Sequence, residues 1–269
     1  MKKQLNVSKE HFKWLRHNKQ KKIGITVCQF TILIVFIAFW ELAGNLNWIN
    51  TFITSTPSRI LATISNLYAS GELFYHIGTT LLETFLGFVI ATLLGTFLAI
   101  LLWWSETLRK ILDPYIVVLN SLPKIALGPL IIIWIGAGMQ SIIAICVLIT
   151  IIITIISMLN NFLACDKEKI LLLKSMGANK FQILTKLILP SAVPGFISVL
   201  KINVGMSWVG SIMGEYLVSS AGLGYLIVYG SQVFKLDLVM ASTIILCVLA
   251  SVMYLLVAGL EKWVQKHRQ

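Results

Sequence analysis

The chain has 269 residues, of which 57% are hydrophobic and only 12% are charged, and its mean hydropathy is +0.86. This composition excludes a soluble enzyme and is typical of a protein that crosses a membrane several times. The net charge of +11 does not indicate nucleic-acid binding, because the basic residues fall in blocks that follow membrane sidedness.

Residues 1–22 are basic and polar, and they form either a short helix on anionic lipid or a solvated tail. The apolar run over residues 23–43 is the first predicted span, since a hydrocarbon core of about 30 Å needs roughly 20 helical residues. We expect no cleavable signal peptide here, because the run is as long as a span and no small-residue cleavage site follows it.

An outer segment, residues 44–75, precedes the second predicted span at residues 76–104. A Thr-Pro-Ser triplet at residues 56–58 is typical of a helix start. One face of that helix is apolar and consists of Ile60, Ile64 and Leu67.

Three residues stand out inside the second predicted span. Gly87 and Gly95 lie nearly on one helix face, which predicts a close helix contact there. Glu83 either lies near the outer interface, which its position favours, or faces a polar cavity.

The third predicted span, residues 112–135, contains Pro114, Pro123 and Pro129. Proline removes a backbone donor and crowds the preceding turn, so this span cannot be a straight helix. Broken backbone at membrane depth is tolerated only against protein or a water-lined path. We therefore expect Lys124 to face a cavity, the alternative being a lysine that extends to the interface.

The remaining spans are predicted over residues 140–159, 195–218 and 236–260, followed by a basic tail at 261–269. In the fifth span, small residues form a flank that another helix can approach: Gly205, Ser207, Gly210, Ser211 and Gly214. Lys201 is expected to extend from the inner end of that span into the interface, and Glu215 to lie near its outer end.

The loop between the fourth and fifth spans, residues 163–194, carries five lysines and cannot cross the bilayer. It contains a predicted helix whose apolar stripe ends at Gly177, followed by a second helical stretch that ends at Pro190. We call residues 166–194 the elbow. Its exposed apolar residues indicate either a docking surface for a partner or a helix that lies flat on the membrane.

Basic residues are distributed unevenly between the two sides of the predicted membrane. The inner segments hold 18 Lys or Arg residues and the outer segments hold two, Arg59 and Lys235. This bias places both termini and the elbow in the cytoplasm.

Motifs for catalysis or metal binding are missing from the sequence. There is no phosphate-binding loop and no H-E-x-x-H motif, and Ser207 is not part of G-x-S-x-G, because Val209 occupies its last position. We therefore expect no enzyme activity, no catalytic residue, no metal site and no cofactor in this chain. The cysteines have no CxxC spacing, and we expect unpaired, buried apolar side chains at Cys28, Cys146, Cys165 and Cys247.

The elbow resembles the inner-loop motif of permease subunits of bacterial ABC importers. Gly177-Ala178, Leu189-Pro190 and Pro194-Gly195 match that motif, whereas three leucines at 171–173 replace its Glu-Ala-Ala. The blocks at residues 56–58, 121–138 and 214–227 are similar to the nitrate/sulfonate/taurine branch of these permeases. The similarity extends from Trp40 to Leu260.

This resemblance implies an all-α polytopic membrane protein of about six spans, like type I ABC importer permeases, with a transmembrane domain over residues 23–260. It implies a homodimer in the bacterial cytoplasmic membrane, two cytosolic ATPase subunits that bind ATP and Mg, and an extracellular or periplasmic solute-binding protein. The solute would be a small anion or zwitterion such as a sulfonate, taurine or nitrate.

The resemblance also implies site residues. Those that couple to the ATPase are Leu171, Leu172, Leu173, Lys174, Met176, Gly177, Ala178, Phe181, Leu189 and Pro190. Candidates for the translocation path are Asn120, Ser121, Lys124, Ser207, Trp208 and Glu215. The alternatives are a structural or interfacial role for Lys124, packing for Trp208, and an interfacial carboxylate at Glu215.

A gradient-driven secondary carrier or a channel without an ATPase is the alternative function. A carrier often has coupling-ion ligands at mid-membrane and an inverted repeat of broken helices. Only one proline-broken span is evident in the sequence, which favours the importer.

Overall fold

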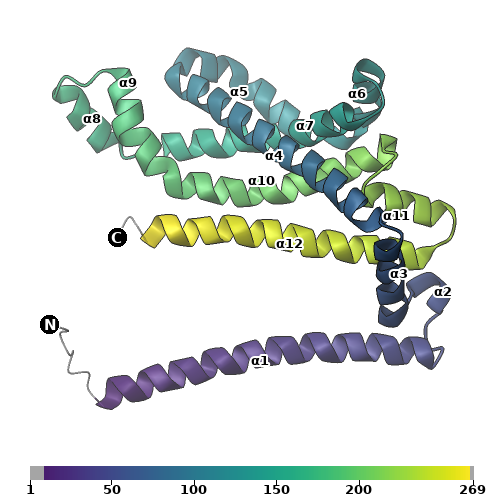
Figure 1. Ribbon diagram of the computed structural model, residues 1–269. Helices are drawn as coiled ribbons and strands as arrows, with labels where there is room; N and C mark the ends of the chain where they lie inside the picture. Colours follow the sequence, from purple (N-terminus) through teal and green to yellow (C-terminus); the bar gives the residue numbers. More distant parts are fainter. Residues whose placement is uncertain (1–8, 267–269) are drawn as a thin grey trace. The chain divides into compact units, whose positions relative to one another are not determined.

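The computed structural model describes residues 9–266, and these form helices and turns with no β-strand among them (Figure 1). The elements are α1 (Lys9–Asn45), α2 (Thr51–Thr54), α3 (Pro57–Ala69), α4 (Glu72–Trp104), α5 (Glu106–Ser121), a 3₁₀ turn (Lys124–Leu127), α6 (Gly128–Ile135), α7 (Met139–Leu163), α8 (Lys167–Ser175), α9 (Lys180–Ile183), a π-helical turn (Leu184–Ile188), α10 (Leu189–Val218), α11 (Leu223–Gln232) and α12 (Leu236–Lys266).

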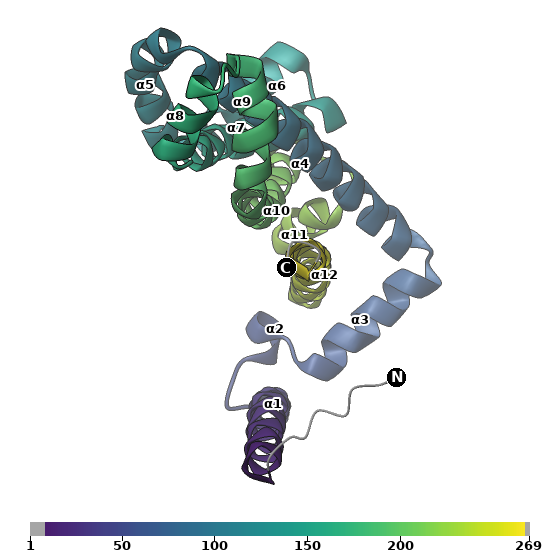
Figure 2. The ribbon, with the colours of Figure 1, turned by 90° about the vertical axis from the view of Figure 1, so that its left-hand side faces the viewer.

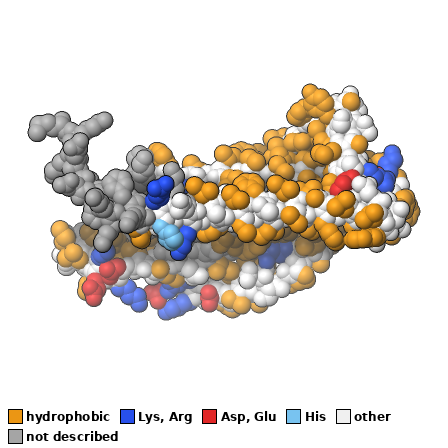
Figure 3. Space-filling model, turned by 90° about the horizontal axis from the view of Figure 1, so that it is seen from below, with side chains coloured by type: hydrophobic (Ala, Val, Ile, Leu, Met, Phe, Trp, Pro, Cys, Tyr) orange, Lys and Arg blue, Asp and Glu red, His pale blue; other side chains and the backbone are white. Residues whose placement is uncertain are grey.

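Five helices in the described part of the chain are long and apolar enough to cross a membrane. The number is six when the bent pair Glu106–Ser121 and Lys124–Ile135 counts as one crossing. The expected all-α membrane fold of about six spans is confirmed. Hydrophobic side chains cover much of the helix surface in Figure 3, as lipid-facing helices require.

The chain divides into two compact units, residues 1–63 and residues 64–269. In the first unit, Glu41 near the end of α1 accepts hydrogen bonds from the backbone N–H (3.0 Å) and the hydroxyl (2.8 Å) of Ser58. A carboxylate is favourable at this position because the first turn of α3 leaves its N–H groups without intrahelical partners. The predicted start of α3 at the Thr-Pro-Ser triplet is confirmed.

The N-terminal basic segment is helical from Lys9 on, and its contact with lipid or with solvent stays a prediction. Residues 1–8 lie outside the described part of the chain, but α1 runs without a break from Lys9 into the first span. The basic residues from position 9 on therefore extend the spanning helix.

Helix α7 is the centre of the second unit and packs between α4 and α10 (Figures 1 and 2). A Cβ atom on Gly95 of α4 would lie 2.7 Å from the Thr154 side chain, and one on Gly210 of α10 would lie 2.6 Å from the Cα of Cys146. The backbones approach this closely because these glycines have no side chain. The predicted glycine contacts are confirmed for both helices, although Gly205 has open space around it.

The third predicted span is broken at one proline only. α5 and the segment from Lys124 to Ile135 meet at 88°, with Pro123 at the break. Pro114 lies inside α5 without ending it, and Pro129 lies in the first turn of α6, where a missing N–H is tolerated. The expectation of a bent span is thus confirmed.

Two further predictions about the spans were wrong. The second helical stretch of the elbow does not end at Pro190, because a π-helical turn over Leu184–Ile188 carries the helix through this proline into α10. A wider turn accommodates a residue that has no N–H to donate. Of the cysteines, all unpaired, only Cys146 is buried, since Cys28 and Cys247 lie on outward faces of α1 and α12.

Candidate functional site

The elbow is a helix–turn–helix whose two helices are each closed by specific backbone geometry. Helix α8 ends at Gly177, which has a φ of +82°, and the Ala178 N–H bonds the Leu173 carbonyl at 2.9 Å. Helix α9 begins at Asn179, whose side chain accepts the Gln182 N–H at 2.8 Å while the Gln182 side chain accepts the Asn179 N–H at 2.9 Å. The predicted stop at Gly177 is confirmed, since glycine adopts this φ without strain.

One face of the elbow is apolar and exposed. Leu171 and Met176 have exposed fractions of 67% and 75%, and Leu172 and Phe181 are exposed to a similar degree. Apolar side chains gathered on one short element are typical of a surface that binds a partner.

The opposite face of the elbow is anchored in the core of the second unit. Ile183 and Leu184 are buried there, next to Phe162 of α7 and Leu102 of α4. The partly buried residues that pack against this cluster include Ile170, Leu173, Ala178 and Leu189. The ten residues predicted to couple to an ATPase therefore fall into an exposed set and an anchored set.

Lys180 joins the elbow to the end of α4, and the sequence analysis did not select it. Its Nζ donates a hydrogen bond to the backbone carbonyl of Trp104 and lies 5.6 Å from the centre of the Trp104 indole ring. A lysine at a helix C-terminus satisfies a carbonyl that has no intrahelical donor. The sequence analysis did place Trp104 at the end of a predicted span. Nothing in the sequence, however, indicates that Lys180 contacts this tryptophan.

Three of the predicted path residues lie together at the break of the third span. Lys124 Nζ donates to the Asn120 carbonyl at 3.1 Å, and Ser121 Oγ donates to the Val117 carbonyl at 3.0 Å. Asn120 and Ser121 are exposed and Lys124 is partly exposed. These three polar residues therefore lie together at the bend of the third predicted span, which is otherwise mostly apolar.

The other three predicted path residues are buried in the described part of the chain. Ser207 is completely buried, and its hydroxyl lies 3.5 Å from that of Thr150. Trp208 packs with Val204 and Val257, as the packing alternative expects. Their burial follows from the close approach of α10 to α7 and of α10 to α12.

Hydrogen bonds between polar side chains join the three central helices. Asn203 of α10 donates to Thr92 of α4 at 2.9 Å and accepts a hydrogen bond from Thr154 of α7 at 3.1 Å. Nearer the other end, the hydroxyls of Thr84 and Ser211 lie 2.6 Å apart. In an apolar environment such bonds hold helices together, because an unmade one leaves a polar group unsatisfied.

Glu83 and Glu215 are buried carboxyl groups at the end of these helices that α11 covers. Their exposed fractions are 2% and 1%. The interfacial depth expected for both residues stays a prediction, but neither side chain is exposed at the surface of this chain. The reason is that α4 and α10 face each other here and α11 covers both.

The family follows from comparison with known proteins. Residues 91–268 match the model of the family described as the binding-protein-dependent transport system inner membrane component. The chain belongs to this family. It is a permease of the ABC importer type, and the resemblance seen in the sequence is confirmed.

Several curated relatives are similar over most of this permease. A putative aliphatic sulfonates transport permease protein of Bacillus subtilis, SsuC, is 30% identical over 87% of this chain and 85% of its own. The taurine transport system permease protein TauC of Escherichia coli is 26% identical over 86% of each chain. The formylaminopyrimidine transport permease protein ThiX of Halalkalibacterium halodurans is 28% identical over 71% of this chain and 76% of its own.

Solved structures share the fold. The permease aligns with a chain of the MetNI methionine ABC transporter in an inward-facing conformation, with a TM-score of 0.62 and 21% identity over 69% of this chain and 93% of that one. A chain of a bacterial ABC transporter for the import of alginate aligns with a TM-score of 0.64 and 16% identity over 92% and 99%. Both are importer permeases, in agreement with the fold class.

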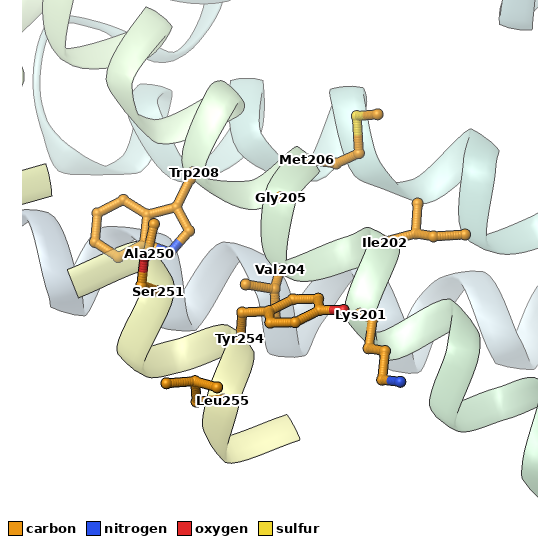
Figure 4. Close-up of a pocket in the computed structure, with 10 residues that line it drawn as sticks. All are labelled: Lys201, Ile202, Val204, Gly205, Met206, Trp208, Ala250, Ser251, Tyr254 and Leu255. Carbon is orange, nitrogen blue, oxygen red and sulfur yellow. The ribbon is translucent and has the colours of Figure 1, made fainter. Parts of the chain in front are cut away.

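A cavity of about 760 Å³ lies between α10 and α12 of the permease (Figure 4). Trp208 contributes an apolar wall from α10 and Tyr254 one from α12, with Lys201 at the edge. Lys201 forms an ion pair with Glu261, a partner that the sequence analysis did not identify. The partner comes from α12, which the sequence could not place beside α10.

Proposed function

We propose that this permease forms the membrane path for a small anionic or zwitterionic solute, such as a sulfonate, taurine or nitrate. The names of relatives support this solute class, because the sulfonate and taurine permeases align over more than four fifths of the chain. The family membership gives the alternative of a self-sufficient carrier or channel no support, since the family's transport depends on a binding protein.

The permease acts as a homodimer with two cytosolic ATPase subunits, and a solute-binding protein delivers solute from the outside. ATP and Mg bind to the ATPase chains, so this chain needs no cofactor of its own. The bias of Lys and Arg supports an orientation with both termini and the elbow in the cytoplasm of a bacterium.

The observation that carries this proposal is the anchored elbow with its exposed apolar face. Leu171 and Leu172 on α8, Met176 just after it and Phe181 on α9 bind in a groove of the ATPase, as an amphipathic helix binds in an apolar groove. Because the other face of the elbow is packed on α4 and α7, movement of the ATPase is transmitted to the spans.

Lys124 supplies the anion contact on the path. One of its three N–H donors is used by the Asn120 carbonyl, which leaves two for a sulfonate or nitrate oxygen. The adjacent Ser121 hydroxyl and Asn120 side chain add polar contacts at the same bend.

Co-purification of the permease with its ATPase tests the docking surface. Leu171→Asp is expected to lower the recovered ATPase at least about tenfold, since burying a charge in an apolar contact costs more than 1.4 kcal/mol. Leu61→Asp is the matched control, because Leu61 on α3 has the same exposed fraction of 67%. Equal recovery from both variants would refute the docking surface.

Uptake by cells that lack and then regain this gene tests the solute. Radiolabelled or growth-limiting sulfonates, taurine and nitrate are compared one at a time. Restored uptake of one of them supports the solute class, whereas restored uptake only of an uncharged or cationic solute contradicts it.

A further inference from the structure

The carboxylate of Glu215 is held at the N-terminus of α11. Glu215 Oε2 accepts the backbone N–H of Gly224 at 2.5 Å and that of Tyr225 at 3.3 Å. These are first-turn N–H groups that have no intrahelical partner, and the helix dipole favours negative charge at this end. The arrangement suits an ionised carboxylate, which only accepts hydrogen bonds.

The turn before α11 is shaped around this carboxylate. A Cβ atom on Gly224 would lie 2.8 Å from Glu215 Oε2, and Gly222 has a φ of +111° and also touches the carboxyl group. A side chain at either glycine would displace Glu215. The two glycines of the Gly-Leu-Gly sequence are therefore required for close approach of the backbone to an anion.

Glu83 of α4 meets Glu215 inside this site. Hydrogen bonds on both sides bring the two residues together. The hydroxyl of Thr84, next to Glu83, lies 2.6 Å from that of Ser211, one turn before Glu215. Thr80, one turn before Glu83, accepts the N–H of Leu223, beside the Gly224 N–H that Glu215 accepts. Both carboxyl groups are almost completely buried. Two ionised carboxylates have acceptors only and repel each other strongly when buried, so a hydrogen bond between them requires one proton. Since Glu215 already receives N–H donors, the proton belongs on Glu83.

Among the residues that the structure describes, no positive charge that could replace the proton is paired with either carboxyl group. The titratable groups near the pair are His76 on α4, Cys146 on α7, Tyr216 on α10 and Tyr225 on α11. His76 Nδ1 accepts the Gly222 N–H at 3.0 Å, so it acts as an acceptor and not as a cation. Farther out, Glu72 adds a second negative charge near His76.

The described ion pairs of this unit join other residues. They are Lys110 with Glu106, Lys169 with Asp166 and Lys201 with Glu261. Within residues 64–266, therefore, no lysine or arginine forms a salt bridge to Glu83 or Glu215.

We propose that Glu83 is protonated and donates its proton to ionised Glu215, forming a buried proton-binding site that fastens α4 to the turn between α10 and α11. Glu83 Oε2 and Glu215 Oε1 are both buried with no other hydrogen-bond partner among the described residues, and a proton on Glu83 supplies the donor that this pair of acceptors lacks. Thr80 strengthens the same connection, because its hydroxyl accepts the Leu223 N–H at 2.8 Å.

This site is separate from ATPase docking and from the solute contact at Lys124. ATP drives transport, so the proton is not a coupling ion. It is a fixed structural proton, and removing it leaves two buried negative charges side by side. Loss of the proton at alkaline pH therefore loosens the outer ends of α4 and α10.

Infrared spectroscopy of the permease in complex with its ATPase tests the proton directly. A protonated carboxyl group has a C=O stretching band that ionised carboxylates lack. We expect this band at neutral pH in the wild type and its loss in Glu83→Gln. An unchanged band after this substitution, or no such band in the wild type, would overturn the proposal.

Thermal unfolding of the same complex gives a second, independent measurement. Glutamine retains an N–H donor at position 83, so Glu83→Gln is expected to keep the Tm within about 2 °C, whereas Glu83→Ala lowers it by about 4 °C or more. At alkaline pH the wild-type Tm falls relative to that of Glu83→Gln. If Glu83→Gln is as unstable as Glu83→Ala and the two pH profiles are parallel, Glu83 is not a proton donor.

Discussion

Lys180 of the elbow donates a hydrogen bond to the backbone carbonyl of Trp104, the last residue of α4. The ammonium group also lies over the indole ring of the same residue. Helix α5 begins two residues later, so this contact connects the elbow to the junction that leads into the broken span. If the elbow moves with an ATPase, as we propose, this contact would carry the movement to α4 and α5.

Replacing Lys180 by Met is expected to weaken coupling without weakening docking. The substitution removes the hydrogen bond and the cation–π contact, which together are worth about 1–3 kcal/mol. Solute uptake per ATP hydrolysed should fall several-fold, while the ATPase still co-purifies. Lys186→Met is the control, because Lys186 is an exposed lysine of the same elbow. Equal uptake per ATP in the two variants would remove Lys180 from the coupling route.

Gly177→Pro is expected to uncouple ATP hydrolysis from transport. Proline fixes φ near −65°, whereas Gly177 has a φ of +82°, so the turn between α8 and α9 cannot form. Gly177→Asn is the control, since asparagine tolerates positive φ. Solute-stimulated ATP hydrolysis and uptake are measured for both variants. Coupled transport in the proline variant would show that the turn is not part of the lever.

Gly95→Val is expected to destabilise the permease by about 1–3 kcal/mol through overpacking. The added side chain would collide with Thr154 of α7, which a Cβ atom alone already meets at 2.7 Å. Gly78→Val on the same helix is the matched control, because nothing lies within 4 Å of its Cβ position. The measurement is Tm in detergent or nanodiscs. Similar Tm values for the two variants would contradict the close packing of α4 on α7.

Lys124→Ala is expected to reduce uptake more than it reduces the amount of folded permease. The side chain supplies the positive charge at the bend, and losing a hydrogen bond to a charged group costs about 1.5–3 kcal/mol. Lys110→Ala on α5 controls for loss of a surface lysine, since Lys110 is exposed and paired with Glu106. Uptake per folded molecule is compared over a range of solute concentrations. A value equal to that of the control would exclude Lys124 from the solute contact.

Several site residues were recognisable in the sequence because their signals are local. Gly177 ends a periodic apolar run, and Pro123 interrupts a span, so both could be assigned a backbone role before any contact was known. The exposed leucines of α8 follow from a basic segment that cannot enter lipid.

The partners of other residues could not be identified from the sequence, because they lie on a neighbouring helix. Glu83 and Glu215 are 132 positions apart, and each one alone is compatible with the membrane interface. Lys201 is paired with Glu261 only because α12 lies against α10. The order of residues along the chain shows how hydrophobic each span is. It does not show which spans pack against each other.

The number of spans, the bent third span and the elbow follow from the order of apolar, charged and proline residues along the chain. They do so because the bilayer imposes length and hydrophobicity on every segment separately. The burial of Glu83 against Glu215 and the contact of Lys180 with Trp104 depend instead on helix packing. Packing in lipid is directed by small residues and hydrogen bonds at specific contacts, and these exist only once the helices are assembled.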